Sequence, residues 1–310
     1  MKVMRFSLAG QHAERLGVLV GHGDVQRILD VGQACEAASA DAPRSMMGLI
    51  ASGDGGLDQL RGLLEWSMSR DDARWWHDPQ QLTWLTPVPE RSCIAAGRNF
   101  GRHRLESMLG NPEAGRNFQA DFPTGFIKLG RTLVPHLASV QRPPDVVQFD
   151  YEVEAAIIMG RAVERASLAQ ARKSIFGYTV FNDLSAREWQ LNEMKNQLVM
   201  MGKNFPGFGP IGPCILTADE VPDPTALRLW LKVNGQFRQQ SDCTDLIFGF
   251  DELVAFWSRV GLRAGDIISS GTPEGVALHR KPDPSQFFLK PGDVVQAGID
   301  QIGVLETRII

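Results

Sequence analysis

Cysteine is scarce in this chain of 310 residues, and the four that occur, Cys35, Cys93, Cys214 and Cys243, lie far apart. They form no Cys-x-x-Cys pair, which argues against a zinc site, and we expect reduced thiols in a cytoplasmic protein. No apolar run approaches the ~18 residues that a membrane helix needs. The first residues also lack the apolar core and the cleavage pattern of a signal peptide.

Basic tracts are missing as well. The formal net charge is −4, and no cluster of lysine and arginine of the kind that neutralises phosphates is present. We therefore expect no nucleic-acid partner. Hydrophobic residues make up 43% of the chain and charged residues 22%, so a substantial core is available and the composition shows no signature of disorder.

Short strand-like segments dominate the chain. Residues 1–90 read as a small unit with paired strands and one amphipathic helix over 56–69, and the proline-containing "TWLTPVPERS" marks a linker. Residues 91–310 contain strands separated by glycine and proline, few helices, and a hairpin signal at Asn234–Gly235. The pattern lacks the regular alternation of a parallel doubly wound fold. It predicts an α+β, β-rich fold with mixed, mainly antiparallel sheets in two domains, 1–90 and 91–310.

The segment "FDYEVEAAIIMG", residues 149–160, contains three acids spaced by two, namely Asp150, Glu152 and Glu154. On one strand such side chains point to the same face. They could belong to a solvated edge, since charged side chains are usually exposed. The apolar run that follows indicates a central strand instead, which would direct the acids into a cleft.

A further carboxylate, Asp183, ends the next strand-like segment, "FGYTVFND", just before a helix start. Asp183 could meet the acids of the first strand. Carboxylate oxygens without nitrogen or sulfur ligands suit a hard divalent cation, Mg²⁺ or Mn²⁺. Water or substrate oxygens would then complete the coordination shell, as a catalytic site requires.

Five motifs, "DYEVE", "GYTVFNDLSARE", "GKNF", "SSGTPEGV" and "LKPGD", follow one another in the order typical of the fumarylacetoacetate hydrolase family. The chain resembles this family from about residue 93 onward, in particular its acylpyruvases and hydroxydienoate isomerases. Residues 1–90 resemble the variable N-terminal domain of many members. The resemblance implies a mixed β-roll catalytic fold, usually homodimeric, with Mg²⁺ or Mn²⁺ held by Glu152, Glu154 and Asp183. It gives Asp150 a hydrogen-bonding role in the approach to the strand.

The segment "GRNFGRHRLES" is similar to the family motif GxNYxxHxxE, with Phe100 at the usual tyrosine. His103 and Glu106 are three apart and would share a helix face, so that the carboxylate orients an imidazole that acts as general base for water. An ordinary pair on a surface helix is the alternative. The resemblance also implies a lid over residues 110–125 that closes on substrate and sets specificity.

Five more side chains match polar positions of the family motifs. The resemblance implies that Lys203 is catalytic and stabilises an enolate. Arg187 and Gln190 would hold a second substrate oxygen or carboxylate, Thr272 would touch the substrate carboxylate, and Lys128 would lie near the cleft. From the residues alone, Lys203 is equally a loop lysine, and Arg187 with Gln190 an exposed helical pair.

Other histidines and phenylalanines match no motif. We expect the histidines at surface or loop positions outside the site: His12, His22, His77, His136 and His279. For His279, which closely follows "GTPEGVAL", a place in the lining of the site is the alternative. For Phe118, Phe122 and Phe205, core packing is the expected role, and an apolar pocket for an acyl group is the alternative.

The resemblance implies metal-dependent hydrolysis of a carbon–carbon bond in a 2,4-diketo acid, such as an acylpyruvate or fumarylpyruvate. Water activated by His103 and Glu106 would attack the distal carbonyl, and an enolate of pyruvate type would leave, stabilised by the metal and Lys203. The alternative function is isomerisation of hydroxydienoates or decarboxylation of oxaloacetate-type acids, both of which pass through the same enolate. A third interpretation is a protein that binds a keto acid without turnover.

Overall fold

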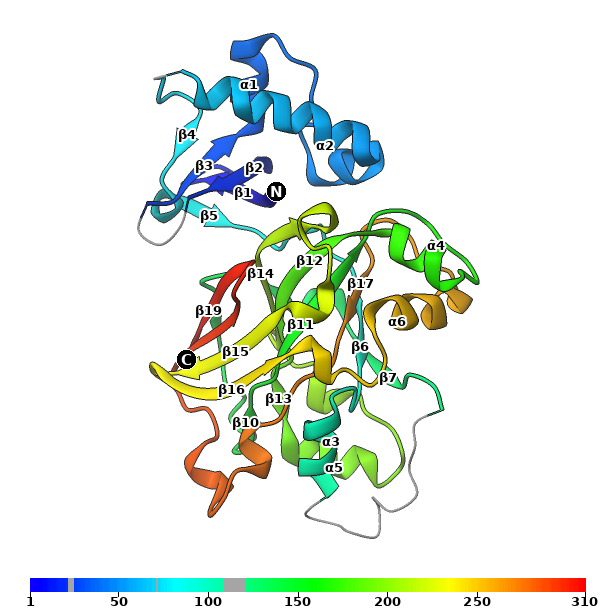
Figure 1. The fold of residues 1–310 in the computed structure, drawn as a ribbon. Coiled ribbons are helices and arrows are strands. Elements are labelled where there is room, and N and C mark those ends of the chain that lie inside the picture. The colour runs from blue at the N-terminus through cyan, green and yellow to red at the C-terminus, as the bar shows by residue number, and fades with distance from the viewer. Residues whose placement is uncertain (22–24, 71, 109–120) are drawn as a thin grey trace.

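The computed structural model describes residues 1–21, 25–70, 72–108 and 121–310 (Figure 1). The N-terminal part contains five strands and two helices: β1 (Lys2–Leu8), β2 (Arg15–Val20), β3 (Arg27–Asp30), β4 (Trp76–His77), β5 (Leu82–Trp84), α1 (Val31–Ala38) and α2 (Met46–Met68). Helix α2 begins well before the residue 56 that the sequence predicts. The glycine-rich segment conceals its first turns, and Gly53, with φ of 57°, kinks the helix there.

The largest sheet runs through both parts of the chain. From residue 91 onward its strands are β6 (Cys93–Ala96), β7 (Gly125–Lys128), β8 (Leu133–Val134), β11 (Val153–Met159), β12 (Ile175–Asn182), β14 (Gly209–Thr217) and β17 (Ile267–Ser269). The strand order is β4-β3-β2-β1-β14-β12-β11-β17-β6-β7, with β5 paired to β1 and β8 to β14. Most pairs are antiparallel, and β6 with β17 and β8 with β14 are parallel.

A second sheet packs against the first. It has the order β16-β15-β18-β19-β9, with β9 (Ser139–Val140), β15 (Arg228–Val233), β16 (Gln236–Asp242), β18 (Val294–Ile299) and β19 (Gly303–Ile309). The predicted hairpin joins β15 to β16, and Asn234 and Gly235 both have positive φ. A two-stranded pair, β10 (Phe149–Asp150) with β13 (Ser185–Ala186), lies beside the site. The expected mixed, mainly antiparallel sheets are confirmed.

Few helices accompany these sheets. They are α3 (Gly101–Met108), α4 (Leu168–Lys173), α5 (Arg187–Met194) and α6 (Phe250–Trp257). Two single turns of 3₁₀ helix matter for the site, η4 (Met201–Lys203) and η9 (Ala277–His279). Figure 1 shows α3 and α5 together at the end of the sheets opposite the N-terminal part, and α4 beside α6 on one flank. Within the described ranges, no helix combines the length and the apolar character needed to cross a bilayer.

The two parts of the chain share one hydrophobic core cluster. Val3, Leu49 and Leu60 of the N-terminal part belong to the same cluster as Phe181 and Ile215 of the central strands. Each such side chain contributes about 1.5–3 kcal/mol when buried. Strand β1 also pairs directly with β14. The division into two domains near residue 90 stays a prediction. The shared core packs residues 1–90 directly against the rest of the chain.

The acidic segment departs from the expected continuous strand. Phe149 and Asp150 pair with β13, whereas β11 begins only at Val153 and pairs with β12 and β17. The chain is irregular at Tyr151 and Glu152. The prediction of three acids on one strand face is therefore wrong, because the pairing partner changes between Asp150 and Glu154.

Candidate active site

A cavity of about 590 Å³ opens between α3, α5 and the end of the central strands. Its polar lining includes both predicted glutamates, the predicted histidine base and three of the predicted substrate contacts: Glu152, Glu154, His103, Arg187, Gln190 and Thr272. Its apolar lining includes Phe122, Phe126, Leu191, Met194, Leu198 and Phe248. Residues far apart in sequence therefore meet at one cavity, as a ligand site requires.

Three carboxylates cluster at this cavity. Glu152 lies in the link before β11, Glu154 lies on β11, and Asp183 directly follows β12. The Asp183 N–H donates to the Glu152 carbonyl oxygen at 2.8 Å, which brings the two segments together. One oxygen from each carboxylate lies within 4.8 Å of the others, and the residues are only 5%, 1% and 0% exposed. The solvated edge is therefore excluded for these acids.

Two buried lysines contact the carboxylate cluster. Lys203 Nζ donates to Glu152 Oε2 and Asp183 Oδ2, each at 2.7 Å. Lys128 Nζ lies 2.7 Å from Asp183 Oδ1 and donates to the carbonyl oxygens of Phe208 and Leu184. Each Asp183 carboxylate oxygen is thus in contact with a lysine ammonium group. Neither lysine is among the described residues that line the cavity.

Arg187 lies at the start of α5 and is 3% exposed. Its Nε donates to Asp150 Oδ2 at 2.8 Å, its Nη1 donates to Gln190 Oε1 at 2.8 Å, and its Nη2 lies 2.6 Å from Glu152 Oε1. The exposed helical pair is therefore excluded for Arg187. Burial opposes its ionised form, but the charges of Asp150 and Glu152 outweigh this effect and raise its pKa.

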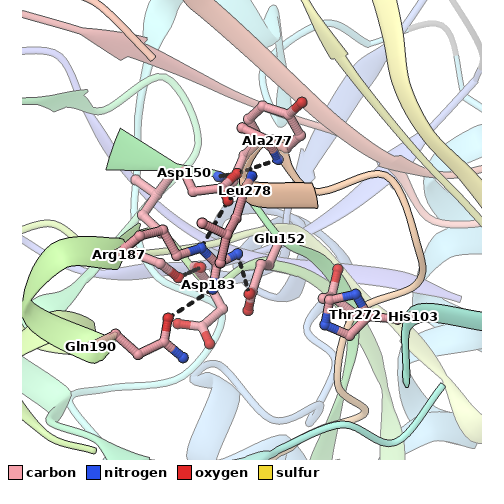
Figure 2. Close-up of polar contacts among 12 residues, drawn as sticks. His103, Asp150, Glu152, Asp183, Arg187, Gln190, Thr272, Ala277 and Leu278 are labelled. Atoms are coloured by element: carbon pink, nitrogen blue, oxygen red, sulfur yellow. Dashed lines mark hydrogen bonds and ion pairs between the residues drawn. The ribbon is translucent and has the colours of Figure 1, made fainter. Parts of the chain in front are cut away.

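Asp150 has the hydrogen-bonding role that the resemblance implies. Figure 2 shows it between Arg187 and the backbone of η9, where Ala277 N donates to Oδ1 at 2.8 Å and Leu278 N donates to Oδ2 at 3.0 Å. The Tyr151 N–H also donates to Oδ1, at 2.8 Å. Asp150 thus connects Arg187 to the turn that ends at His279.

The carboxylates respond differently to this environment. Burial disfavours the charge of Glu152, but Lys203 and Arg187 overcome it and hold its pKa below the usual range. Burial raises the pKa of Glu154 well above its ordinary value, and the negative charges of Asp183 and Glu152 raise it further. Burial also lowers the pKa of Lys128, although Asp183 partly offsets this. The environment therefore disfavours the charged form of Glu154, and a nearby cation would favour it.

The predicted pair His103 and Glu106 forms on α3. His103 Nδ1 lies 3.2 Å from Glu106 Oε2, and His103 is only 9% exposed. The Gly275 N–H donates to both Glu106 oxygens, at 3.1 and 3.2 Å. Gly275 has φ of 100°, and a Cβ there would collide with the Arg238 carbonyl oxygen. An ordinary surface pair is therefore excluded.

Two amide side chains that the sequence analysis did not single out hold the "GTP" loop. Gln239 accepts from Val153 N at 2.9 Å and donates to Thr272 Oγ1 and to the Pro273 carbonyl oxygen, each at 2.9 Å. Asn99 donates to the Ser270 carbonyl oxygen at 2.9 Å. Asn99 is the asparagine of the motif GxNYxxHxxE, so a local pattern contains it, whereas the contacts of Gln239 join segments far apart in sequence.

Two side chains expected elsewhere line the cavity. His279, expected outside the site, faces it from η9, and Phe122, expected in the core, is 55% exposed at its wall. Phe205 packs against Phe208 as expected. The predicted lid over 110–125 lies largely outside the described residues, as do Phe118 and His22.

Residues 92–310 match the family model described as "Fumarylacetoacetate (FAA) hydrolase C-terminal". The chain belongs to the fumarylacetoacetate hydrolase family. The match covers the elements that contribute the carboxylate cluster, the His103–Glu106 pair and the "GTP" loop.

The similarity to two named proteins extends over the whole chain. The mitochondrial oxaloacetate tautomerase FAHD2B of Bos taurus is 31% identical over 316 residues, which cover 100% of this chain and 92% of the relative. Maleylpyruvate hydrolase from Sphingobium sp. SYK-6 is 28% identical with a TM-score of 0.72, covering 100% of this chain and 99% of that structure.

A second solved structure of the family contains a metal. Fumarylpyruvate hydrolase from Pseudomonas aeruginosa, in complex with Mn²⁺ and pyruvate, is 29% identical with a TM-score of 0.62. The similarity covers 72% of this chain and 91% of that structure. Within the family, the present chain is therefore similar both to hydrolases and to tautomerases.

Proposed function

We propose that this protein is a metal-dependent hydrolase of a 2,4-diketo acid of the acylpyruvate or fumarylpyruvate type. The products would be pyruvate, or a substituted pyruvate, and a carboxylic acid. The observation that supports the proposal is the shared cavity. It brings the His103–Glu106 pair, which can activate water, to the cluster of Glu152 and Glu154, which can hold a cation.

Glu152, Glu154 and Asp183 fit Mg²⁺ or Mn²⁺. Their donor atoms are all carboxylate oxygens, which hard cations of this class prefer. The raised pKa of Glu154, which lies within 4.8 Å of the other two carboxylates, indicates a place for a further positive charge. When bound, the ion would supply positive charge to the substrate carboxylate and 2-keto oxygen and to the enolate that develops there.

The chain's own residues perform the proton transfers. His103 uses Nδ1 to contact Glu106, so its Nε2 is the atom that takes a proton from water. Glu106 orients the imidazole and stabilises its protonated form, while Gly275 fixes Glu106 from the opposite side. The resulting hydroxide attacks the acyl carbon of the substrate.

The bond between C3 and the acyl carbon then breaks, and its electron pair remains on C3 as an enolate. Lys203 contributes positive charge beside Glu152 and Asp183, which favours this enolate. Arg187, Gln190 and Thr272 line the cavity and position the keto acid. The proton held by His103 returns to C3, which yields pyruvate and regenerates the imidazole.

Tautomerisation of an oxaloacetate-type acid is a second candidate. The relatives named as oxaloacetate tautomerases favour it, since one is similar over 100% of this chain. Proton exchange at C3 needs the same cluster and enolate, but it needs no attack by water. The two candidates therefore differ in whether the His103–Glu106 pair must activate water.

The deciding experiment measures pyruvate release from acylpyruvates and fumarylpyruvate, and enol–keto conversion of oxaloacetate, with Mn²⁺ and with chelator. For a hydrolase we expect release that chelator abolishes and that His103→Asn lowers at least ~10²-fold. His12→Asn, at an exposed position, is the matched control. Enol–keto conversion without pyruvate release in the unmodified protein would favour the tautomerase. Equal release by His103→Asn would contradict the role of the pair.

The homodimer and the cytoplasmic location expected from the sequence also remain proposals. The family resemblance supports the first, and the reduced cysteines support the second, since all four are buried and unpaired. Analytical ultracentrifugation of the full chain would measure the oligomeric state directly.

A further inference from the structure

His279 is a fixed part of the cavity wall that the mechanism above leaves unused. It ends η9, whose backbone N–H groups at Ala277 and Leu278 donate to Asp150. The next residue, Arg280, donates from Nε to the Gly275 carbonyl oxygen at 3.1 Å. Through Asp150, these bonds connect the turn to Arg187, and through Arg280 they connect it to Gly275. The backbone that carries His279 is therefore held at both ends.

The ring of His279 lies close to the proposed base. Its centroid is 5.9 Å from that of His103, with the planes at 51°. His279 is half-buried, and within the described part of the chain neither of its ring nitrogens has a hydrogen-bond partner. An imidazole with unused hydrogen-bonding capacity thus faces the same space as His103.

Burial favours a neutral His279. Burial lowers its pKa, and His103 and Arg187 lower it further, whereas Glu106 and Asp150 act in the opposite direction. A neutral imidazole keeps one N–H to donate. Such a group can stabilise an oxyanion without giving up its proton.

We propose that His279 contacts the substrate and donates a hydrogen bond to the acyl carbonyl oxygen that becomes negative when water attacks. This role rests on the proposed hydrolase function. A water molecule lies about 3 Å from the nitrogen that activates it, and the attacked carbon lies about 3–3.5 Å from that water. Because the two ring centres are 5.9 Å apart, both imidazoles border the space that the water and the attacked carbonyl group would occupy.

His279 acts during one part of the reaction only. As the water oxygen bonds to the acyl carbon, the carbonyl π pair moves onto the oxygen, which accepts the hydrogen bond from His279. When this pair returns, the bond between C3 and the acyl carbon breaks. The C3 carbanion takes its proton from His103, and His279 keeps its own proton throughout. Enol–keto exchange forms no such tetrahedral centre and should not depend on His279.

The test compares His279→Phe, which keeps a ring without a donor, with His279→Gln, which keeps an N–H donor. Each is assayed with Mn²⁺ for kcat of acylpyruvate hydrolysis, for deuterium exchange at C3 of pyruvate, and for pyruvate binding by calorimetry. We expect His279→Phe to lower kcat about 10²-fold while exchange and binding stay within about threefold. We expect His279→Gln to recover most of the loss. His12→Phe is the matched control and should change none of the three.

Three results would overturn the assignment. Full hydrolysis by His279→Phe would show that no donor is needed at this position. Parallel loss of hydrolysis, exchange and binding in both variants would indicate a structural role instead. If the unmodified protein releases no pyruvate from any acylpyruvate, the hydrolase function fails, and the oxyanion contact fails with it. That third result appears before any variant is made, so the two failures are distinguishable.

Discussion

Asp150 and Arg187 form a buried ion pair, with Nε 2.8 Å from Oδ2, that connects the two halves of the site. On one side, the same guanidinium reaches Glu152 of the carboxylate cluster. On the other, the same carboxylate accepts from the backbone of η9, next to His279. The pair thus sets the position of the cluster relative to the turn.

Asp150→Asn should weaken both connections at once. The variant keeps the shape of the side chain but loses the charge and one acceptor, which leaves a buried guanidinium and N–H groups incompletely paired. We expect a loss of about 1–3 kcal/mol in the free energy of unfolding, and a lower kcat/KM. Urea unfolding and steady-state kinetics measure the two effects. Asp242→Asn is the control, because it alters only an exposed turn at Thr244, and it should lower the free energy of unfolding by less than about 1 kcal/mol. An equal loss of stability in both variants would contradict the role of Asp150.

Glu154→Gln should separate metal binding from folding. Because burial and the neighbouring acids raise the pKa of Glu154, its neutral form is favoured without a cation, and glutamine resembles that form. We expect the variant without metal to be at least as stable as the unmodified protein. Excess Mn²⁺ should stabilise the unmodified protein, by about 2.7 kcal/mol at 100-fold above Kd, but not the variant.

Thermal unfolding with and without Mn²⁺ measures this difference. Glu36→Gln, an exposed glutamate, is the control and should respond to Mn²⁺ normally. An undiminished response in Glu154→Gln would remove Glu154 from the proposed ligand set.

Glu106→Gln should slow hydrolysis without unfolding the protein. Glutamine keeps one oxygen for the Gly275 N–H but cannot stabilise a positive imidazole. We expect kcat for pyruvate release to fall about 10- to 100-fold and the thermal midpoint to change little. Glu274→Gln, one residue from Gly275 and in contact with Arg102, serves as the control. If both variants hydrolyse at the unmodified rate, the carboxylate has no part in catalysis.

His136 should make stability depend on pH. Burial lowers its pKa from 6.5 to about 4, although Glu306 opposes the shift, and its Nδ1 accepts from the Glu306 N–H at 3.0 Å. Because the unfolded chain binds this proton more readily, stability falls as pH drops from about 6.5 towards 4.

Between about pH 7 and 5 we expect a loss of about 2 kcal/mol from this group. His136→Asn keeps an acceptor but cannot titrate, so its urea midpoint should fall less over the same interval. An identical pH dependence in the two proteins would show that another group is responsible.

The carboxylate cluster could be predicted from sequence because its members belong to motifs with strong local patterns. Glu154 and Asp183 lie at ends of apolar strands, and the structure confirms that these ends meet. The break after Asp150 could not be predicted, because alternation of side chains does not reveal where a strand changes its partner. The role of Arg187 as a partner of Asp150 depends on that break.

His279 shows why the rest of the site was missed. It follows the "SSGTPEGV" motif closely but is not part of it, and its place beside His103 depends on contacts of η9 with Asp150, 127 and 128 residues earlier. The pairing of β1 with β14 likewise joins segments more than 200 residues apart. Local periodicity carries no information about such contacts, so the elements were predictable and much of their assembly was not.

The shared core between the N-terminal strands and the central sheet has a consequence for truncated proteins. A chain shortened to residues 91–310 would lose the partner of β14 near Ile215 and would expose Phe176 and Ile211, which belong to that core. Unpaired strand backbone beside an apolar face promotes association between molecules. We therefore expect the shortened chain to aggregate more readily than the full chain, independently of any contact that the first ninety residues make with substrate.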